Sequence, residues 1–383
     1  MNTPKIRFKG FKDDWEQRKV SELFRVTRGY VLAATQTNTT KTDEKPYPVY
    51  SSQTKDKGLM GYYKDYLYED AITWTTDGAN AGTVNYRAGK FYCTNVCGVL
   101  LSNEVKANQM IAEALNNVAK GYVSYVGNPK LMNNVMADIV IQIPTQAEER
   151  EMLSSLFASL DHLITLHQRK CDETKQLKKF MLQKMFPKNG EKNPEIRFEG
   201  FTDAWEQRKF EDVGTVAMCK RIFKEQTSEE GEVPFYKIGT FGGIPDAYIT
   251  RELFEEYKKN YQYPNKGDIL ISASGSIGRT VEYTGKDEYY QDSNIVWLKH
   301  ENDLDNSFLK VLYGVIEWSC EGSTIKRLYN DNFLKTEFML PKIEEQIKIG
   351  EYFSKLDHLI TLHQRKCEKL KALKKFMLQN MFI

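Results

Sequence analysis

Two long segments of the chain carry apolar residues at alternating intervals of three and four positions. In both segments, from about 148 to 186 and from about 344 to 382, this spacing places one apolar stripe along one face of a helix. Each helix of about 38 residues would be roughly 57 Å long, and such a helix is not stable alone in water. We expect the two helices to pair as a coiled coil. The stripe residues are Leu153, Leu156, Leu160, Leu163, Leu177 and Met181 in the first helix, and Ile349, Tyr352, Leu356, Leu359, Leu370, Leu373 and Met377 in the second.

The middle of each stripe is polar. His167, Lys170 and Thr174 continue the spacing in the first helix, and His363 and Lys366 continue it in the second. Polar residues in a coiled-coil seam fix register and orientation at a cost in stability. In an antiparallel pair these polar layers would meet and select one register. The alternative interpretation is a bent helix whose middle is solvated.

The two helices belong to an internal repeat. Residues 160–171 recur letter for letter at 356–367. Near the start of each half, 12 of the 16 positions in 4–19 are identical in 194–209. The chain therefore consists of two tandem halves, each with a lead segment, a variable body and a long helix. We assign residues 1–145 to the first lead segment and body, 146–186 to the first helix, 187–193 to a linker, 194–341 to the second lead segment and body, and 342–383 to the second helix.

The two bodies, about 20–144 and 210–341, share little sequence but have matching features. In each body a β-branched apolar strand runs into a turn rich in glycine and hydroxyl residues, at 70–84 and at 267–281. We expect α/β or α+β bodies with mixed sheets. Because the scaffold is duplicated while the bodies differ, we interpret the bodies as performing the same task on two different targets.

Composition narrows the class of protein without identifying its function. The chain has 383 residues and a net charge of only +2, which indicates two or more domains and no global basic field. The absence of a long apolar run and of a signal-peptide pattern predicts a cytoplasmic protein without a membrane segment. The six cysteines form no CxxC pair and no zinc spacing with the five histidines. Dinucleotide, phosphate-loop, nucleophile-elbow and HExxH motifs do not occur, so the sequence predicts no enzyme activity.

The polar side chains in the bodies are of the kinds that read the edges of DNA bases. Asn and Gln bind adenine, Arg and Lys bind guanine, and Ser and Thr bind either base. Glycine allows the backbone to approach a ligand closely. The same composition is also typical of ordinary turns, so both interpretations stay open. The candidate DNA-binding residues are Ser51, Ser52, Thr75, Thr76, Asp77, Asn80, Thr94, Asn95, Lys237, Thr240, Ser272, Ser274, Ser276, Arg279, Gln291, Ser293 and Asn294.

The order of these features resembles the specificity subunit of type I restriction-modification enzymes. The motifs that carry the resemblance are the helix sequence LDHLITLHQRK and the lead sequence IRFxGFxxxWEQRK, and they place the whole chain in that pattern. The resemblance implies two target-recognition domains separated by two antiparallel conserved helices, with pseudo-twofold symmetry. Each domain would read one half of a split sequence in double-stranded DNA, and the helices would set the length of the spacer.

The resemblance also implies partner subunits. Two modification subunits would bind S-adenosylmethionine and methylate adenine, while restriction subunits would use ATP and Mg²⁺ to translocate and cleave DNA. This chain would hold no cofactor, and its partners would supply much of the positive charge that DNA phosphates require. The alternatives are a coiled-coil adaptor whose two domains bind proteins, and a fused enzyme with degraded motifs. Apolar helix residues off the seam would dock the modification subunits or be covered by the recognition domains: Leu166, Phe180, Leu182, Leu362, Phe376 and Leu378.

Overall fold

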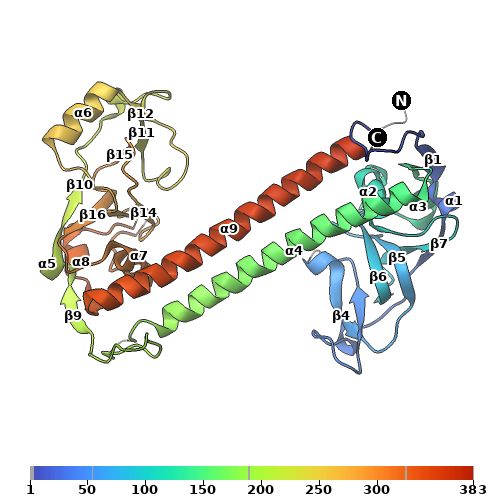
Figure 1. Ribbon diagram of the computed structural model, residues 1–383, viewed down its shortest axis with the longest axis horizontal. Coiled ribbons are helices and arrows are strands. Elements are labelled where there is room, and N and C mark those ends of the chain that lie inside the picture. The colour runs from blue at the N-terminus through green and yellow to red at the C-terminus, as the bar shows by residue number, and fades with distance from the viewer. Residues whose placement is uncertain (1–3, 54, 189, 324–325, 383) are drawn as a thin grey trace. The chain divides into compact units, whose positions relative to one another are not determined.

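The computed structural model describes residues 4–53, 55–188, 190–323 and 326–382. The chain forms two compact units: unit 1 comprises residues 1–169 and 364–383, and unit 2 comprises residues 170–363. The division falls inside both long helices, so each unit contains the N-terminal part of one helix and the C-terminal part of the other (Figure 1). These helices are α4 (Ala147–Lys184) and α9 (Ile343–Met381), close to the two predicted segments.

Unit 1 is built on a six-stranded sheet with the order β2-β7-β5-β6-β3-β4. Its neighbouring strands are antiparallel except for β3 and β6, which are parallel. Helix α2 packs against β6, and the Asn108 side chain caps this helix by accepting a hydrogen bond from the Ile111 backbone N–H. The elements before the long helix are β1 (Glu16–Lys19), α1 (Val20–Leu23), β2 (Phe24–Arg28), η1 (Ala34–Gln36), β3 (Tyr47–Tyr50), η2 (Lys55–Gly58), β4 (Leu59–Tyr63), β5 (Tyr68–Thr75), β6 (Val84–Cys93), β7 (Cys97–Ser102), α2 (Gln109–Val118), η3 (Ala119–Tyr122), α3 (Asn133–Asp138) and β8 (Val140–Ile143).

Unit 2 arranges the matching strands in two smaller sheets, β10-β16-β13-β14 and β12-β11-β15. The parallel pair β11 and β15 corresponds to β3 and β6 of unit 1. Continuous strand β6 is replaced in unit 2 by β14 and β15, which are separated by a turn around Gly285 with φ +87°. The elements are β9 (Glu206–Lys209), α5 (Phe210–Val213), β10 (Gly214–Met218), η4 (Lys224–Gln226), β11 (Val233–Tyr236), β12 (Tyr248–Ile249), α6 (Arg251–Asn260), β13 (Ile269–Ser272), β14 (Thr280–Glu282), β15 (Tyr289–Tyr290), β16 (Ile295–His300), α7 (Asn306–Val315), α8 (Asn330–Leu334) and β17 (Glu337–Leu340).

The repeated lead segment has the same structure in both units. In unit 1 the Arg7 guanidinium donates two hydrogen bonds, of 2.7 and 2.8 Å, to the Glu149 carboxylate near the start of α4. In unit 2 Arg197 binds Glu345 near the start of α9 through two bonds of 2.7 Å. Both carboxylates are only 1% exposed. Because a bidentate arginine neutralises each buried carboxylate, these pairs fasten the lead segments to the long helices.

The lead segments also contact the ends of the long helices. In unit 2 the Ile196 backbone N–H donates to the Lys184 carbonyl oxygen at 2.9 Å, across the linker that follows α4. In unit 1 the Ile6 N–H makes the equivalent bond to Asn380 at 3.0 Å, although these residues lie at opposite ends of the chain (Figure 1). One junction is therefore closed by a covalent linker, and the other is closed by noncovalent contacts, which include the edge-to-face packing of Trp15 on Phe382.

Within each unit the two helix segments run antiparallel. In unit 1 Cys367 Sγ lies 3.9 Å from the Ile164 carbonyl oxygen, and further along α9 Lys374 Nζ lies 2.6 Å from Asp161 Oδ1. Position numbers therefore rise along α9 while they fall along α4. The repeat-equivalent contacts recur in unit 2, at 4.0 and 2.5 Å. The antiparallel orientation is thus present inside both units.

The predicted stripe was wrong at several positions. Leu163 and Leu177 are 39% and 44% exposed, and Lys170 is exposed, as are their equivalents in α9. The buried and half-buried positions instead recur at alternating steps of four and three residues, a seven-residue repeat that includes Cys171. Leu163 and Leu177 lie beside this row. The meeting of polar layers around the histidines stays a prediction. The buried or half-buried seam positions are Leu153, Phe157, Leu160, Ile164, His167, Cys171, Thr174, Lys178, Met181 and Met185 in α4, and Ile349, Phe353, Leu356, Ile360, His363, Cys367, Leu370, Lys374, Met377 and Met381 in α9.

Candidate nucleic-acid interface

The glycine-rich turn of unit 1 follows β5 directly. The Gly82 N–H donates to the Thr75 carbonyl oxygen at 2.9 Å, and Gly78, with φ +89°, donates to the Pro129 carbonyl oxygen at 2.9 Å. Gly82 has φ +79°, and a Cβ there would lie 2.8 Å from Val123 Cγ2. Glycine is therefore required at position 82 both by the backbone conformation and by the close packing. The turn is held between the end of β5 and the loop at 124–130.

Unit 2 places its turn in the equivalent position. The Gly278 N–H donates to the Ser272 carbonyl oxygen at 3.1 Å, and the Gly275 N–H donates to the Lys326 carbonyl oxygen at 3.0 Å. Lys326 thus takes the place of Pro129, and the bridge between Glu321 and Arg327 takes the place of the bridge between Ser124 and Lys130. Sequence similarity between the two turns is faint, but the two backbone hydrogen bonds given for each turn correspond to one another.

In unit 1 the structure brings most of the predicted residues together. Thr94 Oγ1 donates to Ser51 Oγ at 3.0 Å, and Asn80 Nδ2 donates to the Ser52 carbonyl oxygen at 3.0 Å. The end of β3 lies beside the end of β6 because these two strands are parallel, and the end of β5 lies beside Cys97, directly after the turn that follows β6. The loop after β3, the turn after β5 and the turn after β6 therefore form one polar surface.

The corresponding residues of unit 2 also converge. Gln291 Oε1 accepts a hydrogen bond from the Ile238 N–H at 2.8 Å, and Arg279 Nη2 donates to the Ile238 carbonyl oxygen at 2.6 Å. Thr240 Oγ1 accepts from the Lys237 N–H at 3.2 Å. The loop after β11 is thus fixed by side chains from the two neighbouring turns.

Burial divides the predicted residues into two groups. The hydroxyls of Thr75, Thr76, Thr94, Ser272 and Ser274 belong to residues that are at most 8% exposed. Ser272 Oγ, for example, donates to the Ser276 carbonyl oxygen and accepts from the Arg279 N–H, so it serves to hold the turn. The members that are half-buried or exposed, and so reachable from outside, are Ser51, Ser52, Asp77, Asn80, Asn95, Lys237, Thr240, Ser276, Arg279, Gln291, Ser293 and Asn294.

Arg87, which no sequence motif marks, lies on β6 beneath this surface. Arg87 is 6% exposed and lines a polar hollow of about 230 Å³ together with Ser51, Thr75 and Asn80. Its Nε donates to Thr73 Oγ1 at 3.0 Å. Burial lowers the pKa of the guanidinium. A single arginine in a strand does not mark a binding site in the sequence. The only indication is its position on the inward side of β6.

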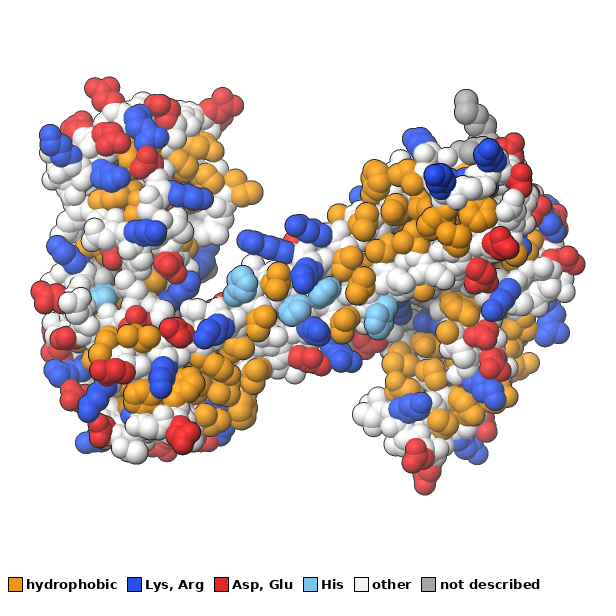
Figure 2. All heavy atoms as spheres, in the orientation of Figure 1, with side chains coloured by type: hydrophobic (Ala, Val, Ile, Leu, Met, Phe, Trp, Pro, Cys, Tyr) orange, Lys and Arg blue, Asp and Glu red, His pale blue; other side chains and the backbone are white. Residues whose placement is uncertain are grey.

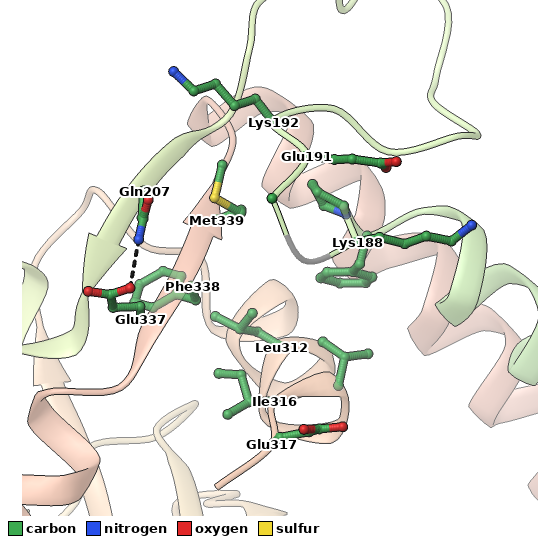
Figure 3. Close-up of a pocket in the computed structure, with 14 residues that line it drawn as sticks. Lys188, Glu191, Lys192, Gln207, Leu312, Ile316, Glu317, Glu337, Phe338 and Met339 are labelled. Atoms are coloured by element: carbon green, nitrogen blue, oxygen red, sulfur yellow. Dashed lines mark hydrogen bonds between the residues drawn. The ribbon is translucent and has the colours of Figure 1, made fainter. Parts of the chain in front are cut away.

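A larger hollow of about 500 Å³ lies in unit 2 beside the end of α4 (Figure 3). Phe186, Leu312 and Phe338 give it an apolar wall, and Gln207 Nε2 donates to Glu337 at 2.6 Å on its rim. Unit 1 has a hollow of similar size in the equivalent place, beside Phe382 at the end of α9. The duplicated scaffold therefore repeats a surface depression as well as its helices.

The predicted partner-binding residues differ in exposure. Phe180 and Phe376 are 48% and 51% exposed. Leu166 and Leu362 are half-buried. Leu182 and Leu378 pack against the cores of their own units, so each is partly covered by its own unit. Figure 2 shows hydrophobic side chains interspersed with Lys, Arg and His along the exposed surface of the long helices.

Within the described part of the chain, no cluster of three or more His, Cys, Asp or Glu side chains could hold a metal ion. The same residues include no helix that is both long and apolar enough to cross a membrane.

The fold and the polar surfaces define a protein with a duplicated scaffold and two unlike binding domains. Its residues 12–176 and 202–372 match the family described as the type I restriction modification DNA specificity domain. The chain therefore belongs to this family. It is 37% identical over 310 residues to a putative type I restriction enzyme specificity subunit of Haemophilus influenzae, covering 79% of this chain and 78% of the relative.

Two further comparisons agree with this assignment. A putative type I specificity subunit of Mycoplasma pneumoniae is 25% identical over 319 residues, which is 81% of each chain. The crystal structure of the type I restriction-modification S subunit from M. genitalium matches with a TM-score of 0.73 over 100% of this chain and 99% of that chain, at 14% identity. The likeness to the solved structure concerns the fold, and the expected two-domain, mixed helix and strand architecture is confirmed.

Proposed function

We propose that this chain selects the DNA target of a type I restriction-modification complex and catalyses no reaction itself. Each of its two recognition domains reads one half of a bipartite sequence in double-stranded DNA. The observation that carries the proposal is the combination of a repeated scaffold with two different sheets, each presenting a polar surface at equivalent strand ends. Two unlike surfaces on one repeated frame suit two unlike half-sites.

Within each surface, the half-buried and exposed polar side chains contact base edges, and the buried hydroxyls shape the turns that carry them. Asn80 in unit 1 and Gln291 in unit 2 have the amide groups that pair with adenine. The buried serines and threonines act through the backbone that they hold. Partner subunits supply much of the charge that binds phosphates, because this chain is nearly neutral.

The long helices set the spacer between the half-sites and dock two modification subunits. Phe180 and Phe376 are repeat-equivalent, exposed and flanked by the exposed Leu177 and Leu373. Because each unit presents one such surface, two copies of one partner are expected. Those partners bind S-adenosylmethionine and methylate adenine, and restriction subunits bind ATP and Mg²⁺. The complex acts in the cytoplasm and needs no membrane.

The test is to map adenine methylation across the genome of cells that contain this chain and its modification subunit. A split motif is expected, and exchange of residues 210–341 for another body should change only one half of it. Exchange of residues 20–144 is the matched control and should change only the other half. Absence of a methylated motif, or a motif that neither exchange alters, would contradict the proposal and favour a protein-binding adaptor.

A further inference from the structure

Arg87 is a buried cation for which the described residues provide no carboxylate partner. Two of its five N–H groups are used by the protein: Nε donates to Thr73 Oγ1 at 3.0 Å and Nη2 donates to the Lys57 carbonyl oxygen at 2.7 Å. The guanidinium carbon lies 3.6 Å from the centre of the Tyr50 ring. The Tyr50 side chain also interacts with the guanidinium as a hydrogen-bond partner, which leaves at least two of the five N–H groups for an outside ligand.

The scaffold arginine Arg7 provides an internal comparison. The Arg7 side chain is only 9% exposed, and its charge is neutralised by the bidentate contact with Glu149. Burying an ion without an opposite charge is much less favourable than burying a paired one. Fastening the loop at Lys57 needs only a neutral donor. The cation–π contact with the Tyr50 ring offsets part of the cost of burying the Arg87 charge, but no described carboxylate neutralises it.

The hollow beside Arg87 has the chemistry of a nucleic-acid site. Its walls include the amide side chains of Gln53, Asn80 and Asn85 and several hydroxyls, and the described residues that line it include no Asp or Glu. It opens among the loop after β3 and the turn after β5, where the half-buried candidate DNA-binding residues Ser51, Ser52, Asp77 and Asn80 lie. A ligand that enters from the DNA side would therefore meet donors and acceptors first and the guanidinium at the base.

In unit 2 the comparable arginine is used differently. Arg279 also donates to a loop carbonyl oxygen and lies 5.8 Å from an aromatic ring centre, that of Phe241, but it is exposed to solvent. The nearby cation Lys237 is paired with Asp246 at 2.9 Å. The recessed and unpaired cation is thus a property of the first recognition domain.

We propose that Arg87 binds a pair of acceptor atoms of the DNA at the first half-site, either O6 and N7 of a guanine or two oxygens of a phosphate. Arginine presents two parallel N–H groups that match both acceptor pairs. Arg87 is then a specificity residue if the acceptor is a base and an anchoring residue if it is a phosphate. This inference rests on the proposed function of the chain in DNA recognition.

The experiment uses the complete complex of this chain with its modification subunits and a duplex containing the mapped target. Single 7-deazaguanine substitutions remove N7 at each guanine, and single methylphosphonates remove charge at each phosphate. One such change in the first half-site should weaken binding by the wild-type complex at least about tenfold. The same change should cause no further loss with Arg87→Gln, because the interacting group is already absent.

Salt dependence separates the two sources of acceptors. If the ligand is a phosphate, Arg87→Gln should reduce the slope of log K against log[salt] by about 1. If it is a guanine, the slope should stay and the methylation motif should relax at one position of the first half-site only. Arg87→Lys should restore part of the phosphate contact but little of the bidentate guanine contact. Arg25→Gln, which removes an exposed arginine from β2 of the same unit, is the control for a general loss of charge.

Several results would overturn the inference. One is a wild-type complex that tolerates every modification in the first half-site, a result that does not depend on whether any variant folds. Another is an Arg87→Gln complex with unchanged affinity, motif and salt slope but a lower unfolding temperature, which would mark Arg87 as purely structural. A wild-type complex that binds no specific DNA would overturn the proposed function together with the inference.

Discussion

The two units have the same scaffold but differ in the sheets that they carry. The lead segment, its bidentate arginine and the antiparallel helix segments correspond contact by contact. The recognition sheet is continuous in unit 1 and divided in unit 2, where β14 and β15 replace β6. What both sheets keep is a parallel strand pair beside a glycine-rich turn. The position of the polar surface therefore depends on this local junction and not on the extent of the sheet.

The largest loss of stability is expected from removing the buried arginine–glutamate pair that both units share. Glu149→Ala leaves Arg7 buried without its partner, and Glu345→Ala does the same to Arg197 in the other unit. Each change should lower the free energy of unfolding of its unit by about 3–5 kcal/mol. Urea unfolding of the full chain, followed separately by probes in each unit, measures both values. Because the geometry is equivalent, a difference above about 1 kcal/mol between them would show that the two scaffolds are not energetically alike.

A second prediction concerns a packing difference between the sheets. In unit 1 Trp74 lies against Gly98, where a Cβ would come within 2.1 Å of the indole ring, whereas in unit 2 the paired residues are Ile271 and Val296. Gly98→Val should therefore destabilise unit 1 by about 1–3 kcal/mol or more through overpacking.

The double variant Trp74→Ile with Gly98→Val reproduces the pair of unit 2 and should recover part of this loss. Chemical unfolding of the wild type, both single variants and the double variant gives the coupling energy. Additive effects would mean that the clash is relieved elsewhere. Loss of the bond from Trp74 Nε1 to the Leu131 carbonyl oxygen, 3.0 Å long, limits the recovery.

A third and smaller difference lies in the helix seam. Thr174 of α4 in unit 2 is the repeat equivalent of Leu370 of α9 in unit 1, and both are half-buried. Thr174→Leu should stabilise unit 2 by up to about 1 kcal/mol, because it adds apolar surface to the seam, and Leu370→Thr should destabilise unit 1 by a similar amount. Thermal unfolding of both variants measures the two effects. The two substitutions should change the stability in opposite directions, and a stabilising effect of Leu370→Thr would contradict the assigned seam.

This seam also shows how far the sequence predicted the structure. The helices and their length followed from the repeat and the apolar spacing. The apolar spacing predicts the wrong stripe because Leu163 and Leu177 are apolar, whereas the buried seam passes through Cys171 and Lys178, which are less hydrophobic than leucine. A strict heptad count through Cys171 would have found it.

The candidate interface was predictable to a similar degree. The glycine-rich turns were found because glycine marks unusual backbone conformations, and the hydroxyls beside them were found by composition. Burial was not predictable, so Thr75 and Ser272 could not be distinguished from exposed residues such as Asn95. Arg87 was missed because its place in the hollow depends on the parallel pairing of β3 and β6, which no local pattern encodes.

The smallest expected effect is a pH dependence confined to unit 2. Hydrogen bonds from Lys184 and Lys188 lower the pKa of Glu195 from 4.5 to about 2, whereas the equivalent position in unit 1 is Lys5. Because the pKa of Glu195 is lower in the folded state, its ion pairs contribute fully to the stability of unit 2 above the unfolded pKa near 4.5. This contribution is lost as the pH falls toward 2. The Glu195 carboxylate is exposed, so the effect is small and should shrink further in high salt. Between pH 5 and about pH 2.5 the free energy of unfolding of unit 2 should fall more steeply for the wild type than for Glu195→Gln. An identical pH profile for the two proteins would exclude Glu195 as a source of the asymmetry between the units.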